Sequence, residues 1–259
     1  MEGRTAGMEC GRKAGRYLGR CSSVAWVPKG DGAFVVAHAD GNLYVYEKTK
    51  DGAADPSFPA AKDQTQFSVA HARTSKTNPI ARWHICQGSI NSIAFSNDGV
   101  HMAAVGRDGY LRVFDYLKEQ LICGGKSYYG ALLCCAWSGD GKYILTGGED
   151  DLVQVWSMED RKVVAWGEGH NSWVSGVAFD PYWSPPNSDD SGENVVYRFG
   201  SVGQIKILCI SILFKSLMSS SLSEVSPSPF LLDEANVLAI SLLFSNPDPL
   251  GVLLRWVWG

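Results

Sequence analysis

The feature that most constrains this chain is an internal repeat with an offset of 42 residues. Residues 90–115 (INSIAFSNDGVHMAAVGRDGYLRVFD) align with residues 132–157 (LLCCAWSGDGKYILTGGEDDLVQVWS) without a gap. An earlier copy spans 21–47 and carries one extra residue in its first turn. A fourth copy begins at Gly169 and is interrupted by an insertion over 180–194. A fixed period of this length indicates a repeat architecture in which each copy is one structural unit.

Each copy has the sequence pattern of a small antiparallel sheet. An alternating apolar strand leads into a tight turn, as at 98–99, and a second strand of small residues follows. A second turn then begins with an aspartate in three of the copies: Asp40, Asp108 and Asp150. A third strand follows, and the connecting stretch supplies a fourth, as at 163–166. Four strands in about 40 to 45 residues are typical of a propeller blade, so no helix is expected in the repeats.

The boundaries of the repeats define the predicted domain organisation. We predict an all-β, incomplete β-propeller of about three and a half blades over 21–204. The polar segment 49–78 separates the first two copies and is predicted to be a loop insertion that holds one outer strand. Residues 1–20 are Gly-rich and basic without an apolar core, so they do not form a secretory signal. We predict a disordered lead-in there, with a nuclear signal as the alternative.

The repeat ends abruptly after Gln204. Alignment with the earlier turns predicts an aspartate at the next position, where the sequence has Ile205. Neither turn signals nor the period continue over 205–259. We predict a non-repeat tail without a well-packed place in the propeller. Two origins for this tail are open: a truncated, read-through product and a divergent C-terminal module.

The motif residues of the repeats resemble those of the WD-repeat family. The third copy carries the fullest set: Thr146, Gly147, Asp150 and Trp156. In that family the turn aspartate bonds a histidine in the loop before the blade, and the histidine contacts the Ser/Thr and the Trp. Only the fourth copy has the Gly-His pair, which makes His170 its structural histidine. Cys86 and Tyr128 hold the histidine position in the second and third copies.

Three longer strings carry a more specific resemblance. They are KSYYGALLCCAWSGDGKYILTGGEDDLVQVWS, GHNSWVSGVAFD and YRFGSVGQ. They are similar to the family of WD repeat-containing protein 20, the dystrophia myotonica WD-repeat protein and the fungal protein CreC. This resemblance implies a non-catalytic cofactor that binds and activates a ubiquitin-specific protease. Two other functions stay open: a different adaptor, such as a ubiquitin-ligase substrate receptor or signalling scaffold, and a non-functional truncated isoform.

Composition and motifs argue against catalysis and against several classes of partner. A net charge of −4 gives no reason to expect a nucleic-acid or membrane partner. Seven cysteines without CxxC spacing, and histidines without ligand spacing, predict no metal site and a reducing compartment, the cytosol or nucleus. The run at 124–127 ends like a phosphate loop, but Gln120 stands where its first glycine belongs. We expect no enzyme, no cofactor and no small-molecule substrate.

The candidate binding residues lie in the predicted loops at one rim. Tyr128, Tyr129 and Trp173 precede the first strands of the third and fourth copies. Arg107 and Glu149 each directly precede a turn aspartate at the same rim. Large aromatic side chains anchor protein interfaces, although they also pack between blades. We predict that Tyr129 and Trp173 anchor the protease and that the two exposed charges contribute less.

Overall fold

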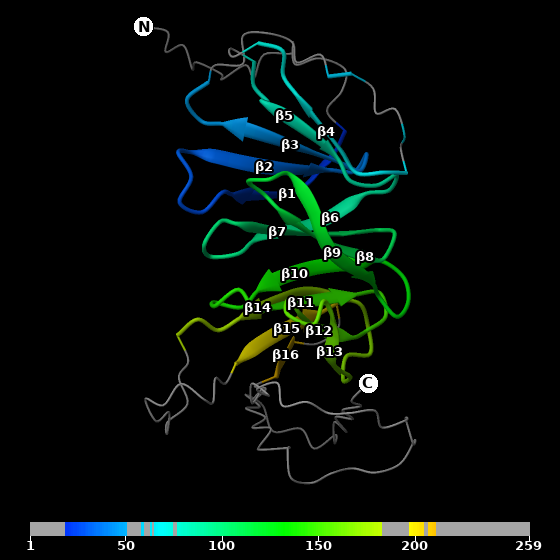
Figure 1. Ribbon diagram of the computed structural model, residues 1–259. Helices are drawn as coiled ribbons and strands as arrows, with labels where there is room; N and C mark the ends of the chain where they lie inside the picture. The colour runs from blue at the N-terminus through cyan, green and yellow to red at the C-terminus, as the bar shows by residue number, and fades with distance from the viewer. Residues whose placement is uncertain are drawn as a thin grey trace, which may run out of the picture.

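The computed structural model describes residues 19–50, 58–59, 63, 65–74, 77–182, 197–204 and 207–210. Over these ranges the regular structure is entirely β-strand, and no helix there is long and apolar enough to cross a membrane. The strands form four antiparallel sheets that follow one another in chain order, from blue to yellow in Figure 1. The predicted all-β fold is therefore confirmed.

The first sheet has five strands in the order β1-β2-β3-β5-β4. These strands are Cys21–Trp26 (β1), Ala33–His38 (β2), Asn42–Glu47 (β3), Ser68–His71 (β4) and Ala81–His84 (β5). The outer strand predicted within 49–78 is β4, which lies at the edge of the sheet. The strand β5 was not predicted, because it joins the sheet only by pairing with β3, from which the insertion separates it in the sequence. It pairs with β3 where the fourth strand of the blade belongs.

The second and third sheets each contain four strands in simple chain order. The second consists of Ile90–Phe95 (β6), His101–Gly106 (β7), Tyr110–Asp115 (β8) and Gln120–Lys126 (β9). The third consists of Leu132–Trp137 (β10), Tyr143–Gly148 (β11), Val153–Ser157 (β12) and Lys162–Gly167 (β13). The first strands start at residues 90 and 132, so the sequence offset is also the structural offset. The fourth strand predicted at 163–166 is confirmed as β13.

The fourth sheet has three strands in the described part of the chain, fewer than the other sheets. Its strands are Val174–Phe179 (β14), Phe199–Gly203 (β15) and Ile207–Ile210 (β16), paired in that order. A single strand at 207–210 extends this sheet beyond Gln204 without the predicted aspartate, so the tail prediction stays open. The rest of the predicted tail, the lead-in at 1–18 and most of the insertion lie outside the described residues.

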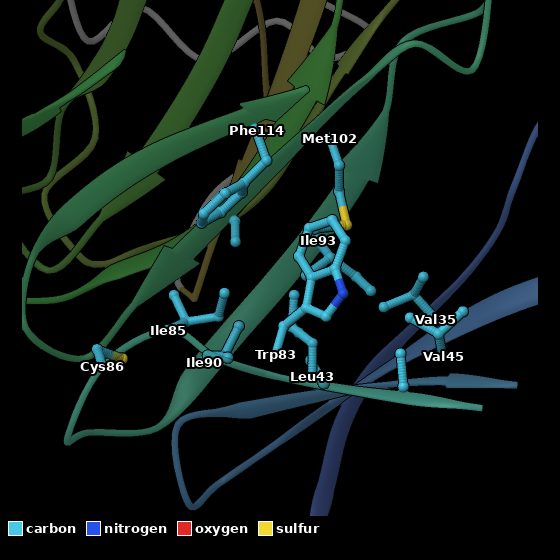
Figure 2. Close-up of a cluster of buried hydrophobic side chains, with 13 residues drawn as sticks. Val35, Leu43, Val45, Trp83, Ile85, Cys86, Ile90, Ile93, Met102 and Phe114 are labelled. Atoms are coloured by element: carbon cyan, nitrogen blue, oxygen red, sulfur yellow. The ribbon is translucent and has the colours of Figure 1, made fainter. Parts of the chain in front are cut away.

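The hydrophobic core lies between consecutive sheets. Successive side chains of a strand point to opposite faces of its sheet, and in most of these strands apolar residues occur on both faces. Between the first two sheets Trp83, Phe114 and Met102 are almost fully buried, and Figure 2 shows them meeting from β5, β8 and β7. A second cluster joins the next pair of sheets through Trp137 and Trp156, and a third joins the last pair. Each sheet is therefore stabilised by the sheet that packs on it.

The turn at Gly41 lies against the backbone of the β5–β6 connection, and this close approach can be tested. Gly41 has a φ of 80°, and a Cβ atom there would lie 1.8 Å from the Cys86 carbonyl oxygen. Gly141 has a φ of 72° with nothing within 4 Å of the same position. Gly141→Ala should cost about 1–2 kcal/mol for the left-handed backbone alone. Gly41→Ala should cost about 1–3 kcal/mol more, because the backbone must also move apart. Urea unfolding of both variants measures the difference, and equal midpoints would contradict the close approach.

Candidate protein-interaction rim

One rim of the stacked sheets collects the predicted binding residues. Strand direction alternates, so the β7–β8, β9–β10, β11–β12 and β13–β14 connections all lie at the same edge. We call this edge the entry rim, because the chain enters the third and fourth sheets there. Arg107 and Glu149 lie in the first and third of these connections. Tyr128, Tyr129 and Trp173 lie in the second and fourth.

The turn aspartates at this rim occupy equivalent places, as predicted. Asp40, Asp108 and Asp150 each accept the backbone N–H two residues on, at 3.1, 3.2 and 3.3 Å. Such a side-chain bond stabilises the turn locally. The fourth predicted turn falls at residues 205–206, outside the described residues. The repeated turn thus fixes the rim end of the second and third strands of each of these sheets.

Asp150 also fixes the loop that carries the predicted aromatic residues. Its carboxylate accepts backbone N–H bonds from Tyr128 and Tyr129. Burial raises the pKa of the Asp150 carboxyl above its usual range, and the bonds from the backbone amides lower it. Tyr128 stands at the family's histidine position, so the backbone of this loop takes the place of the histidine side chain. The two aromatic rings are thereby left free to point outward.

The remaining motif residues of the third blade form a second bond. The indole N–H of Trp156 donates to the Thr146 hydroxyl at 2.8 Å, and both side chains are buried. This bond ties β12 to β11 and satisfies a donor that would otherwise be buried without a partner. In the third blade, where Tyr128 holds the histidine position, the Thr and the Trp of the motif thus bond each other directly.

The fourth blade retains the histidine. His170 and the Ser201 hydroxyl are 2.8 Å apart, and both residues are buried. The His170 Nδ1 atom has no hydrogen-bond partner among the described residues. Burial lowers the pKa of His170 below its ordinary value of 6.5, although Asp151 opposes the shift. His170 is thus a structural residue that stays neutral at neutral pH.

The three aromatic side chains predicted to bind a partner, of which Tyr129 and Trp173 are the predicted anchors, are exposed. Tyr128 is 88% exposed, Tyr129 is 73% exposed and Trp173 is 45% exposed. The alternative, that these rings pack between blades, does not hold for Tyr128 or Tyr129. Trp173 lies directly before β14, and its carbonyl accepts the Gln204 N–H at 3.1 Å. The β9–β10 and β13–β14 connections therefore present exposed aromatic rings at the rim, and hydrogen bonds hold the backbone of both connections.

The two predicted rim charges differ in their surroundings. Arg107 is exposed. Glu149 is half-buried, and its carboxylate accepts the Ala131 N–H at 3.1 Å. This bond links the β9–β10 connection, which carries Tyr129, to the β11–β12 turn. Glu149 thus has a structural role at the rim that its sequence position did not reveal.

Sequence reasoning missed a cationic cluster beside these residues. The Arg112 guanidinium and the Lys126 ammonium lie 5.1 and 5.8 Å from the centre of the Tyr110 ring. Arg112 also forms an ion pair of 2.6 Å with Asp108. The three residues come from β8 and β9, so only strand pairing brings them together. The sequence feature that could have indicated this cluster is Tyr110, an aromatic residue directly after a turn at the rim.

Comparison with known proteins agrees with this geometry. The WD40 family profile (WD domain, G-beta repeat) matches residues 78–115 and 122–157. This chain carries WD repeats. The two matched segments cover most of the second and third sheets.

A relative is similar to this chain over a longer stretch. The WD repeat-containing protein 20 homolog of Caenorhabditis elegans is 40% identical over 187 residues. The match covers 67% of this chain and 24% of the relative, so the WD-repeat chain spans about a quarter of that protein's length.

Two solved structures are similar at low identity. They are the crystal structure of RRP9 WD40 repeats, with a TM-score of 0.47 at 15% identity, and the structure of U3-55K, with a TM-score of 0.48 at 16% identity. Each match covers 63% of this chain and 43% of the other.

The buried histidine predicts a pH dependence of stability. Because its pKa is lowered in the folded protein, the unfolded chain binds the proton first as the pH falls through 6.5. Folding stability should therefore be lost on acidification, and the loss should be smaller in a His170→Gln variant. Urea unfolding of both proteins at pH 8 and at successively lower pH measures the two slopes. Parallel slopes would show that His170 is not held neutral by the fold.

Proposed function

We propose that this WD-repeat chain is a non-catalytic scaffold whose entry rim binds and activates a ubiquitin-specific protease. The observation that carries the proposal is the exposure of Tyr128, Tyr129 and Trp173 on hydrogen-bonded loops of one rim. Rigid aromatic side chains lose little conformational entropy on binding and are enriched among interface hot spots. A rim of this kind suits recognition of a folded protein surface.

The scaffold part of the proposal rests on the repeats themselves. WD-repeat proteins are generally non-enzymatic, and the matched repeats supply the strands that hold the rim. The polar motif side chains are occupied in structural bonds: Asp150 in its turn, Thr146 with Trp156, and His170 with Ser201. The described motif residues therefore stabilise the blades and position the rim.

The protease as partner rests on the resemblance to the WD repeat-containing protein 20 family. The 40% identity to a protein of that name supports it. The rim also carries positive charge at exposed Arg107, and at Lys126 beside the Tyr110 ring. Exposed aromatic side chains together with such cations suit a partner surface that is partly apolar and partly acidic. We place this interaction in the cytosol or nucleus, which the free thiols of buried Cys134 and Cys135 support.

Removing the anchors should weaken protease binding. Tyr129→Ala and Trp173→Ala should each raise the dissociation constant about thirtyfold, because truncating a central aromatic anchor costs about 2 kcal/mol. Arg107→Ala should cost less, because its charge is screened by solvent. Biolayer interferometry against a panel of ubiquitin-specific proteases gives the constants, and cleavage of a fluorogenic ubiquitin substrate reports activation.

The matched control is Tyr182→Ala. Tyr182 is an exposed ring that follows β14 at its far end, away from the entry rim. It should leave both readouts unchanged, and thermal melting should be the same for all variants. Parent-like binding by both anchor variants would show that the rim is not the protease site. Capture of ligase subunits in place of any protease would favour the other adaptor function.

A further inference from the structure

Backbone hydrogen bonds set the order of the connections along the entry rim. The Ser127 N–H of the β9–β10 connection donates to the Gly109 carbonyl of the β7–β8 turn at 2.8 Å. On its other side, the Glu149 N–H of the β11–β12 turn donates to the Ala131 carbonyl at 2.9 Å. The β13–β14 connection comes next, because β12 and β13 are paired neighbours. The β9–β10 connection therefore lies between the turn of the second sheet and the turn of the third.

The part of the rim that belongs to the second sheet carries unpaired positive charge. Lys126 and Tyr110 are paired at the rim ends of β9 and β8, and both are exposed. Arg107, in the β7–β8 turn, is exposed as well. Asp108, the carboxylate of this turn, is held in the ion pair with Arg112. Because neither Arg107 nor Lys126 forms an ion pair with another described residue, this part of the rim is cationic.

The part that belongs to the β11–β12 and β13–β14 connections carries the opposite charge. The first of these connections begins with Glu149, Asp150 and Asp151, and the second begins with Glu168. Neither connection contains Lys or Arg. Backbone N–H groups bond the carboxylates of Glu149 and Asp150. Asp151 and exposed Glu168 form no ion pair with another described residue, so this part of the rim is anionic.

The two charges are separated along the rim by the β9–β10 connection. The pairing of β12 with β13 places Asp151 and Glu168 at neighbouring strand ends, on one side of this connection. Arg107 and Lys126 lie on its other side, toward the β7–β8 turn. The exposed tyrosine rings of the connection thus come between a positive and a negative group.

The first sheet extends neither charge. Its turn at this rim carries Asp40, which is exposed. The adjacent Ala39 N–H donates to the carbonyl of Arg20 at 2.9 Å, and Arg20 is also exposed. Because a basic and an acidic residue adjoin there, the separation of charge is confined to the second, third and fourth sheets.

We infer that this separation of charge sets the orientation in which a folded protein docks on the entry rim. The partner surface that fits has acidic side chains over the second sheet, an apolar centre over the β9–β10 connection and basic side chains over the next two connections. Complementary charges of this kind steer diffusional encounter and make the reversed orientation unfavourable. The inference rests on the proposed function, since the protease is the partner that is oriented. It adds that the partner surface carries both signs of charge.

Nuclear magnetic resonance of the full 259-residue chain tests the separation of charge without any partner. Two nitroxide probes of opposite charge, the anionic carboxy-PROXYL and the cationic aminomethyl-PROXYL, relax the backbone amide protons that they approach. The anionic probe should relax the amides of Arg107 and Lys126 more strongly than the cationic probe does. The order should be reversed at Asp151 and Glu168. Equal relaxation by the two probes on both sides of the β9–β10 connection would overturn the inference, whether or not a protease binds.

Charge reversal at the rim distinguishes the order of the charges from the net charge. Lys126→Glu and Glu168→Lys should each lower the association rate constant with the ubiquitin-specific protease about tenfold at low salt, because both disturb electrostatic steering. The double variant keeps the net charge of −4 but inverts the rim, so it should associate more slowly than either single variant. These differences should shrink at high salt. Stopped-flow fluorescence at several salt concentrations measures the rate constants.

The matched controls lie at the opposite rim. Lys142→Glu and Glu159→Lys reverse exposed charges in the β10–β11 and β12–β13 turns, and they should leave the rate constant unchanged, singly and together. Association of the rim double variant at the parent's rate would show that only net charge matters, which would overturn the inference while the proposed function stands. Parent-like binding by the two anchor variants would instead contradict the proposed function and leave the measured order of charges intact. Circular dichroism and thermal melting establish that each variant is folded.

Discussion

The packing of one sheet on the next is the interaction on which the rest of this structure depends. Each sheet has two apolar faces, and no sheet can bury both by itself. The three buried clusters accordingly lie between sheets, with Trp83 and Phe114 in the first and Trp137 and Trp156 in the second. Wherever a neighbour is present, the inner faces are almost completely buried. Trp26, on the face of the first sheet that none of the described sheets covers, is 60% exposed.

Polar bonds at the rim act within the frame that this packing provides. The aspartate turn recurs, but the carboxylate has different partners in the second and third blades: Arg112 for Asp108, and the amides of the loop before the blade for Asp150. In the third blade a tyrosine stands where the family has a histidine, and the loop backbone is bonded instead. This exchange keeps the blade closed and frees the ring of Tyr128. Differences in what the turn aspartate bonds therefore change which side chains the rim exposes.

The rim residues and the buried sheet faces have different surroundings. Rim residues project from connections whose backbones are held by hydrogen bonds, such as those from Ala131 to Glu149 and from Gln204 to Trp173. The sheet faces pack on one another through apolar side chains. Side chains at the rim can therefore vary without disturbing the core between the sheets.

The sequence by itself determined the period, the strand order within a blade and the aspartate turns, because these depend on local alternation and turn chemistry. It also located the rim residues, since a loop position follows from the repeat. The short strand β5, the bond from Ala131 to Glu149 and the cations on Tyr110 join residues from separate segments, so only the folded chain revealed them. Trp26 and Trp137 make the distinction clearest. They hold the same repeat position, yet one is 60% and the other 8% exposed, because a neighbouring sheet covers only the second.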